Sequence, residues 1–201
     1  MPHYEACDEI MVLKSLGLTY EEIAETMFPH KDKKKILYIH GYSSSKDSST
    51  GKKLAQYLPN TDVITETFSA NPHEAIEQAN KLISEHKIDL VVASSYGAFF
   101  AMQLKGTLRL LINPCLYPSE QFGKRHPEFQ YLSECVELEK TVLGNNFQQI
   151  HAIFATSDEL FSYKEVFAKY CSNIIMVKDK HRLNYTNIKK VVVPKVKALI
   201  D

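Results

Sequence analysis

The sequence has no excess of either charge, no long hydrophobic run and few cysteines. Lys plus Arg and Asp plus Glu each number 24, so no overall field favours nucleic acid or an anionic membrane. No apolar run approaches the roughly 20 residues of a transmembrane helix. Glu5, Asp8 and Glu9 stand where a signal peptide would be basic. We therefore expect a cytoplasmic protein without a membrane span.

Metal and nucleotide sites find little support. The cysteines form no C-x-x-C pair; they are Cys7, Cys115, Cys135 and Cys171. Of four histidines, His40, His86 and His126 have no carboxylate at the i, i+4 spacing of a metal site, and His73 has only Glu77 there. The stretch SSTGKK resembles a phosphate-binding loop, but Lys46 and Lys53 occupy the positions that require Gly and Ser or Thr. We expect neither a metal nor an organic cofactor.

From Ile36 onward, strand-like and helix-like segments alternate along the chain. The predicted strands cover residues 36–39, 62–68, 90–93, 108–112, 150–155 and 174–177. Helices are predicted between them; Asn71-Pro72-His73-Glu74, for example, combines an N-cap with Pro at the first helical position. Such alternation requires crossover connections and a parallel sheet covered on both faces. The predicted fold class of residues 34–201 is α/β, a three-layer sandwich around a mostly parallel sheet.

Residues 1–33 have a different pattern, which predicts a short N-terminal helical hairpin. Residues 9–16 fit a helix, Gly17 its C-cap, and Thr19 with Glu22 a capping box that opens a second helix. This pair resembles the start of a helix-turn-helix. However, residues 1–30 carry six acidic side chains and one lysine, whereas a module that contacts phosphates should be basic. We expect no nucleic-acid binding, and a structural or partner-docking role.

The stretch DLVVASSYGAFF, residues 89–100, places Ser95 between a buried strand and an apolar helix. A catalytic serine at such a turn sits on a sharp, strained bend, so the residues two before and two after it must be small. Ala93 and Gly97 meet this requirement, whereas Ser94 has the bulky Tyr96 two positions on. Taken alone, the pattern also fits an ordinary strand-to-helix turn.

Two carboxylates and one histidine are candidates for partners of Ser95. Asp158 follows a later strand, and His181 follows the last one. Sites in α/β sheets form beyond the carboxyl ends of the strands, and Ser–Asp–His is the order of an α/β-hydrolase triad. Asp179 lies only two residues before His181. In an extended segment, side chains two residues apart point the same way, which leaves little room for an in-line bond from Asp179 to Nδ1 of His181. We predict Ser95, Asp158 and His181 as the catalytic residues, although each partner taken alone also fits a surface loop.

The first predicted strand ends on His-Gly, and the loop that follows can supply the backbone N–H of Tyr42. The helix after Ser95 begins with the backbone N–H of Tyr96 and a favourable dipole. We predict that these two amides form the oxyanion hole. A plain glycine turn is the alternative for the first of them.

Four stretches carry a family resemblance: ILYIHGYSSS, VVASSYGAFFA, LLINPCLYPSE and ATSDELFSYKEV. With the histidine after the last strand, they resemble the YqiA-like (UPF0227) esterases, a branch of the α/β-hydrolase superfamily, from about residue 36 to residue 201. The resemblance implies an esterase that uses Ser95, Asp158 and His181. The family pattern has glycine at the positions of Ala93 and Ala98, and leucine at position 96.

The resulting prediction is a serine hydrolase of the α/β-hydrolase class. We expect a carboxylesterase that cleaves small or medium acyl esters, with a small-molecule acyl ester as its partner. Residues 114–146, which contain Phe122, Phe129 and Tyr131, are a candidate lid over the acyl pocket, with a surface excursion as the alternative. Two alternative functions remain at this point: a thioesterase or peptidase of the same fold, and a non-catalytic binding module that docks a partner.

Overall fold

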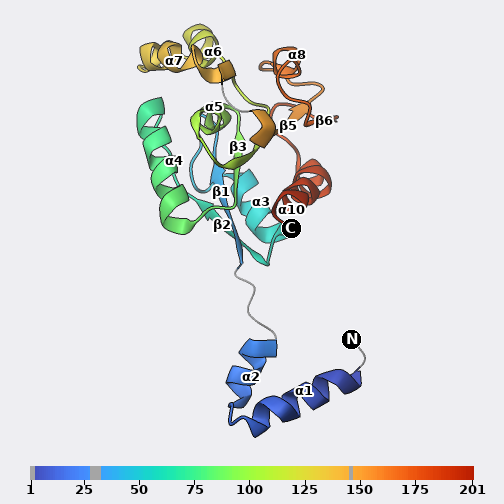
Figure 1. The fold of residues 1–201 in the computed structure, drawn as a ribbon. Helices are drawn as coiled ribbons and strands as arrows, with labels where there is room; N and C mark the ends of the chain where they lie inside the picture. Colours follow the sequence, from blue (N-terminus) through green and yellow to red (C-terminus); the bar gives the residue numbers. More distant parts are fainter. Residues whose placement is uncertain (1–2, 28–32, 145–146) are drawn as a thin grey trace. The chain divides into compact units, whose positions relative to one another are not determined.

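The computed structural model describes residues 3–27, 33–144 and 147–201 (Figure 1). The chain divides into two compact units, residues 1–33 and residues 34–201. Residues 1–2 and 28–32 of the first unit, and residues 145–146 of the predicted segment 114–146, lie outside the described residues.

Six parallel strands form the centre of the second unit, in the order β2-β1-β3-β4-β5-β6. The strands are β1 (Lys34–Ile39), β2 (Thr61–Thr65), β3 (Leu90–Ser94), β4 (Leu108–Ile112), β5 (Ile150–Ala155) and β6 (Ile174–Val177). The predicted α/β fold class is confirmed, and the carboxyl ends of all six strands lie at one edge of the sheet.

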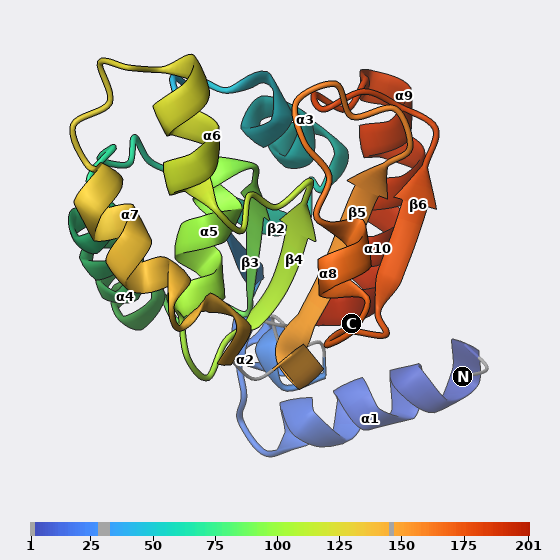
Figure 2. The same ribbon diagram turned by 90° about the horizontal axis from the view of Figure 1, so that it is seen from above.

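Helices cover both faces of this sheet. They are α3 (Ser49–Tyr57), α4 (Pro72–His86), α5 (Tyr96–Gln103), α6 (Pro118–Arg125), α7 (Leu132–Glu139), α8 (Lys164–Phe167), α9 (Tyr185–Asn187) and α10 (Val193–Ile200). Three short helical turns complete the unit, namely η1 (Val142–Gly144), η2 (Phe147–Gln149) and the π-helical η3 (Ile188–Val192). Figure 2 shows α4, α5 and α7 on one side of the sheet and α3 and α10 on the other.

Alternation along the strands divides the apolar side chains between two cores. In β1, Leu37 and Ile39 pack into the core beneath α4 and α5, whereas Ile36 and Tyr38 pack beneath α3 and α10. Successive side chains of a strand point to opposite faces, so a strand covered on both faces must be apolar throughout. This explains the continuous apolar runs at residues 36–39 of β1 and 90–93 of β3.

The strand β2 ends at Thr65, three residues before the predicted end at Phe68. Beyond Thr65 the backbone leaves the sheet and meets His40, in the loop after β1. The N–H of Phe68 donates to Nε2 of His40 at 3.0 Å. Since Nε2 accepts, Nδ1 of His40 carries the proton and donates to the carbonyl of Gly41 at 2.8 Å. The buried imidazole thereby holds the loop that follows β1.

The C-terminal helical segment is interrupted just before Pro194. The π-helical turn η3 runs from Ile188 to Val192, and α10 begins at Val193 with Pro194 in its first turn. Proline lacks the N–H that would continue the preceding helical ladder. The wider turn adapts the chain to this loss.

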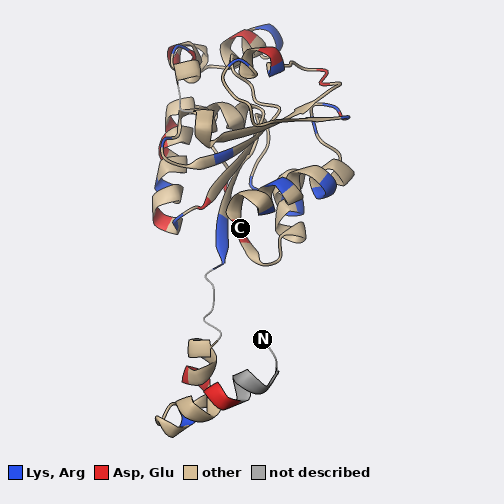
Figure 3. Ribbon diagram, turned by 45° about the vertical axis from the view of Figure 1, so that its right-hand side comes forward, with Lys and Arg blue, Asp and Glu red and all other residues tan. Residues whose placement is uncertain are grey.

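The first unit contains two helices, α1 (His3–Ser15) and α2 (Tyr20–Met27). Glu22 Oε2 accepts the N–H of Thr19 at 2.7 Å, and Thr19 Oγ1 accepts the N–H of Glu22 at 3.2 Å, which is the predicted capping box. Figure 3 shows the acidic residues of α2 in red, and Lys14 is the single Lys or Arg between residues 3 and 27. No helix in the described ranges is both long and apolar enough to cross a membrane.

Candidate active site

Ser95 occupies a strained bend between β3 and α5. Its φ of 54° and ψ of −120° lie in a region that residues with a side chain rarely adopt. Three backbone hydrogen bonds hold this conformation. The N–H of Ser95 donates to Ile112 at 2.9 Å, and its carbonyl accepts from Ala98 and Cys115, each at 3.1 Å. The bend is therefore fixed by the neighbouring strand and by the helix it opens.

Gly97 is required because the loop after β1 passes directly over the first turn of α5. A β-carbon added to Gly97 would lie 2.3 Å from the carbonyl oxygen of His40 and 2.6 Å from that of Ile39. Both neighbours are backbone atoms, which cannot rotate away. The need for a small residue two positions after Ser95 thus has a specific steric cause.

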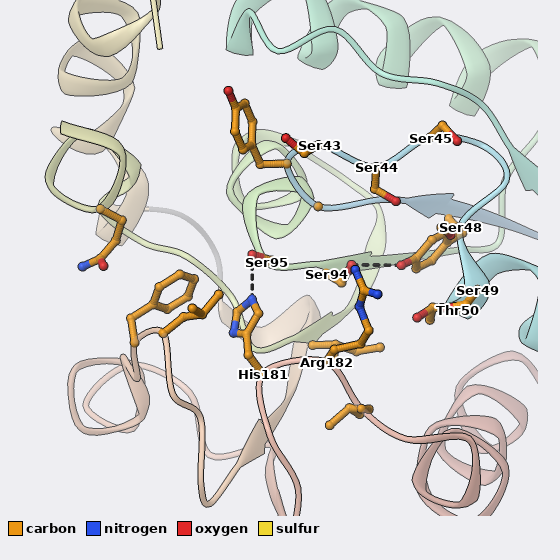
Figure 4. Close-up of a pocket in the computed structure, with 18 of the residues that line it drawn as sticks. Ser43, Ser44, Ser45, Ser48, Ser49, Thr50, Ser94, Ser95, His181 and Arg182 are labelled. Atoms are coloured by element: carbon orange, nitrogen blue, oxygen red, sulfur yellow. Dashed lines mark hydrogen bonds between the residues drawn. The ribbon is translucent and has the colours of Figure 1, made fainter. Parts of the chain in front are cut away.

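Ser95, His181 and Asp158 form a continuous hydrogen-bonded chain. His181 Nε2 lies 2.9 Å from Ser95 Oγ, and His181 Nδ1 lies 2.7 Å from Asp158 Oδ2 (Figure 4). The side chains of His181 and Asp158 are only 12% and 3% exposed. They come from loops after β6 and β5, and the serine from the end of β3. The structure thus brings together the three residues that the sequence singled out.

The carboxylate of Asp158 is fixed in its orientation by the loop that follows it. Its second oxygen, Oδ1, accepts the N–H of Leu160 at 2.9 Å and that of Phe161 at 3.1 Å. The ring of Phe161 meets the ring of His181 edge to face, with centroids 4.8 Å apart. Oδ2 is therefore aimed at His181, and the imidazole has little freedom to rotate.

Two residues that the sequence did not single out hold the backbone of His181. Its N–H donates to Oε2 of Glu159 at 2.9 Å, and its carbonyl accepts from Nδ2 of Asn113 at 2.7 Å. Asn113 Oδ1 also accepts the N–H of Ala155 at 2.7 Å. Asn113 is buried and has a φ of 44°, which asparagine tolerates better than most residues. A polar residue directly after the buried run of β4 was the signal that could have marked it.

Asp179 and Ser94, the rival candidates in the sequence, have other partners. Asp179 Oδ2 accepts from the N–H of Asn184 and from Nδ2 of Asn187, each at 2.8 Å, so it closes the loop that carries His181. Ser94 Oγ lies 2.9 Å from the hydroxyl of Tyr38.

The loop after β1 lies against Ser95. A β-carbon added to Gly41 would be 3.1 Å from Cβ of Ser95 and 3.7 Å from its Oγ. Tyr42 follows in this loop, and Tyr96 is the first residue of α5, where an amide has no acceptor within the helix. Among the described residues, neither of these two amides donates to another protein group. Both are available to an anionic oxygen.

A cavity of about 660 Å³ opens beside Ser95 and His181. Its wall includes the side chains of α6 and of the loop after β5, among them Phe122 and Phe161. Among the residues that the structure describes, no group of three or more His, Cys, Asp or Glu side chains is placed to hold a metal ion.

Residues 35–200 match the profile described as "Uncharacterised protein family (UPF0227)". The chain belongs to this family. The resemblance found in the sequence is thereby confirmed. No curated protein matches the chain.

The fold of this UPF0227 protein is similar to those of several solved α/β hydrolases. One is Est1E from Butyrivibrio proteoclasticus, with a TM-score of 0.67, 13% identity, and coverage of 88% of this chain and 91% of that one. Another is mouse alpha/beta hydrolase domain-containing protein 10, with a TM-score of 0.66, 11% identity, and coverage of 83% of this chain and 89% of that one. A third is the esterase EaEST from Exiguobacterium antarcticum, with a TM-score of 0.56, 11% identity, and coverage of 84% of this chain and 92% of that one. These likenesses show the α/β-hydrolase fold.

The departures of this UPF0227 chain from the family pattern fit its packing. Ala93 and Ala98, which stand where the pattern has glycine, are both fully buried. Tyr96 replaces a leucine, and its hydroxyl donates to the carbonyl of Ala70 at 2.9 Å. Burial raises the pKa of Tyr96 far above its usual value, so the side chain remains a neutral donor.

Proposed function

We propose that this protein is a serine hydrolase that cleaves carboxylic esters, with Ser95 as nucleophile, His181 as general base and Asp158 as the residue that orients the imidazole. The observation that carries this proposal is the hydrogen-bonded chain of 2.9 Å and 2.7 Å that ends on a strained serine. Nucleophile, base and orienting carboxylate within hydrogen-bonding reach are the arrangement that acyl transfer requires.

The proton positions follow from the geometry. Asp158 accepts from Nδ1 of His181, which leaves Nε2 as the acceptor for the hydroxyl proton of Ser95. As Oγ attacks the ester carbonyl, Nε2 takes this proton, and it then returns the proton to the leaving alcohol. A water molecule, activated in the same way, releases the acid from the acyl-enzyme. Asp158 stays ionised and stabilises the imidazolium.

The negative oxygen that develops on the substrate is assigned to the amides of Tyr42 and Tyr96. Tyr96 begins α5 directly after Ser95, and Tyr42 follows Gly41, whose backbone lies against the Ser95 side chain. Removing one such donor typically costs about 3 kcal/mol of transition-state stabilisation. The N-terminal end of α5 adds a favourable dipole.

An ester of small or medium size suits the cavity. Its volume of about 660 Å³ lies in the range of small-molecule sites. Phe122 and Arg125 of α6 contribute to its wall, which supports the assignment of residues 114–146 as a lid. A ferulic acid complex is known for Est1E, and EaEST is named an esterase. We favour an ester over a thioester or a peptide, and we assign the chemistry to residues 34–201 without a role for nucleic acid.

Labelling with a fluorophosphonate probe tests the proposal, because the probe reacts covalently with an activated serine. We expect the wild-type protein to be labelled and to hydrolyse short 4-nitrophenyl esters, and Ser95→Ala to lose both activities. Ser94→Ala is the matched control. It removes a neighbouring hydroxyl and should still be labelled. A wild-type protein that is not labelled would favour the non-catalytic binding module instead.

A further inference from the structure

The cavity beside Ser95 has two chemically different sides. One side carries the apolar side chains of Tyr42, Phe122, Leu160 and Phe161, beside the polar residues Gln121, Arg125 and His126. The other is rich in hydroxyl groups and carries one guanidinium, that of Arg182, and one carboxylate, that of Asp47. The hydroxyls belong to Tyr38, Ser44, Ser45, Ser48, Ser49, Thr50 and Ser94. Figure 4 shows the side chain of Arg182 next to Ser94, on the side of the cavity that Ser48 and Thr50 line.

Arg182 is the cation that a ligand in this half of the cavity would meet. In the described part of the chain, no carboxylate forms an ion pair with its guanidinium. Arg125, the other arginine in the cavity wall, donates to the carbonyl of Leu160. The one carboxylate in the polar half, that of Asp47, is paired with Nζ of Lys52 at 3.0 Å.

The buried hydroxyl of Tyr38 lines the same polar half of the cavity as Arg182. Burial raises the pKa of the Tyr38 hydroxyl, and the hydrogen bonds of Ser94, Thr50 and Ser48 together with the charge of Arg182 oppose that rise. Arg182 is exposed, and its charge is the smallest of these influences on Tyr38. Its side chain nevertheless lies on the same side of the cavity as these hydroxyls (Figure 4).

We propose that Arg182 and the surrounding hydroxyls bind an anionic group of the substrate, so that the enzyme prefers esters with one apolar end and one carboxylate or phosphate end. Arginine pairs with both anions through two parallel N–H donors, and hydroxyl groups can donate to the remaining oxygens. The apolar side of the cavity then holds the uncharged end. This inference rests on the proposed hydrolase function.

Matched ester pairs test the preference on both sides of the scissile bond. Mono-4-nitrophenyl adipate carries a free carboxylate on the acyl side, and 4-nitrophenyl hexanoate has the same chain length without it. On the alcohol side, 3-acetoxybenzoate is compared with its methyl ester. We expect the wild-type protein to have a higher kcat/KM for the anion in at least one pair. In that pair, Arg182→Gln should lower the anion-to-neutral ratio about tenfold, mainly through KM.

Lys180→Gln is the control for this experiment. It removes one positive charge from the same loop, but Lys180 does not contribute to the cavity wall. Its anion-to-neutral ratio should stay within about twofold of the wild-type ratio, because an exposed charge outside the cavity is screened. An equal fall in both variants would show a diffuse charge effect, and an unchanged ratio in Arg182→Gln would show no anion site. Either result overturns the proposal.

Binding to an inactive protein separates this inference from the proposed function. The Ser95→Ala protein, with and without Arg182→Gln, is titrated with monoethyl adipate and with monoethyl phosphate and followed by NMR. Weaker binding of either anion in the protein that lacks Arg182 would support the anion site. It would do so even if the wild-type protein hydrolysed no ester, because the absence of hydrolysis would refute only the hydrolase function. Ester hydrolysis by the wild-type protein, combined with anion binding that does not depend on Arg182, would refute only the anion site.

Discussion

At the scale of single residues, two aspartates beside His181 have separate structural tasks. Asp158 meets Nδ1 of the imidazole in line at 2.7 Å. Asp179 instead organises the loop on which the histidine is carried, through bonds to Asn184 and Asn187. Burial opposes the ionisation of Asp179, but the hydrogen bonds it accepts outweigh this effect and lower its pKa.

Substituting each aspartate by asparagine should therefore have different consequences. Asp158→Asn keeps the shape but loses the charge that selects the tautomer, so kcat should fall by several orders of magnitude, toward ~10⁴-fold. Asp179→Asn should reduce kcat less than about tenfold, a barrier change under about 1.4 kcal/mol. Steady-state kinetics with a short 4-nitrophenyl ester measures both, with circular dichroism as the check on folding. Our assignment of the acid would be wrong if Asp179→Asn were the more damaging change.

At the scale of secondary-structure elements, the contact between the loop after β1 and the first turn of α5 builds the site. His40 fixes the loop through its bonds to Phe68 and Gly41. Gly97 lets this loop approach the helix so closely that a side chain has no room. In the same loop, Gly41 lies against Ser95, and Tyr42 follows it. The geometry of the site thus depends on one close contact between two elements.

Gly97→Ala should disrupt this contact. The added methyl group would lie 2.3 Å from a backbone oxygen, so β1 and α5 must separate, at a cost of roughly 1–3 kcal/mol or more. Urea unfolding measures this loss. Gly123→Ala, in α6, is the matched control, because nothing lies within 4 Å of its added methyl group. Alanine is favoured over glycine in an exposed helix by about 0.5–1 kcal/mol, so this control should be neutral or stabilising. Equal stability of the Gly97→Ala and Gly123→Ala proteins would contradict the steric argument.

At the scale of the whole molecule, two histidines in the sheet unit link its stability to pH. Burial lowers the pKa of His40, and a hydrogen bond to Gly41 only partly offsets it. Burial, together with the charge of Lys195, lowers the pKa of His151. The folded protein therefore favours the neutral imidazoles.

The free energy of unfolding should consequently fall on mild acidification. Above the ordinary histidine pKa of about 6.5, both imidazoles are neutral in the folded and unfolded states. Below it, the unfolded chain binds protons that the folded chain resists, so stability is lost as the pH falls toward the lowered folded values. Urea unfolding at several pH values between about 7.5 and 5.5 measures the slope. His40→Gln and His151→Gln should each reduce it, and an undiminished slope in the double variant would refute the assignment.

The amino-acid pattern by itself determined the fold class and the order of the three site residues. The strands at residues 108–112, 150–155 and 174–177 have the predicted bounds, because mainly apolar runs between polar turns mark strands. Small residues around Ser95 and polar residues after the later strands indicated the site, since these requirements are local. The resemblance to the UPF0227 family came from the same local stretches and is confirmed over residues 35–200.

Only the tertiary structure decided what holds these residues together. Asn113 meets His181 across a separation of 68 residues, and Glu159 meets it across 22. The early end of β2 depends on His40, which lies 28 residues before Phe68. The polar side of the cavity likewise unites Arg182 with hydroxyls from β1, the loop after it, the start of α3 and the end of β3. Such contacts depend on which loops the parallel sheet brings to one edge, and a pattern of neighbouring residues does not contain that information.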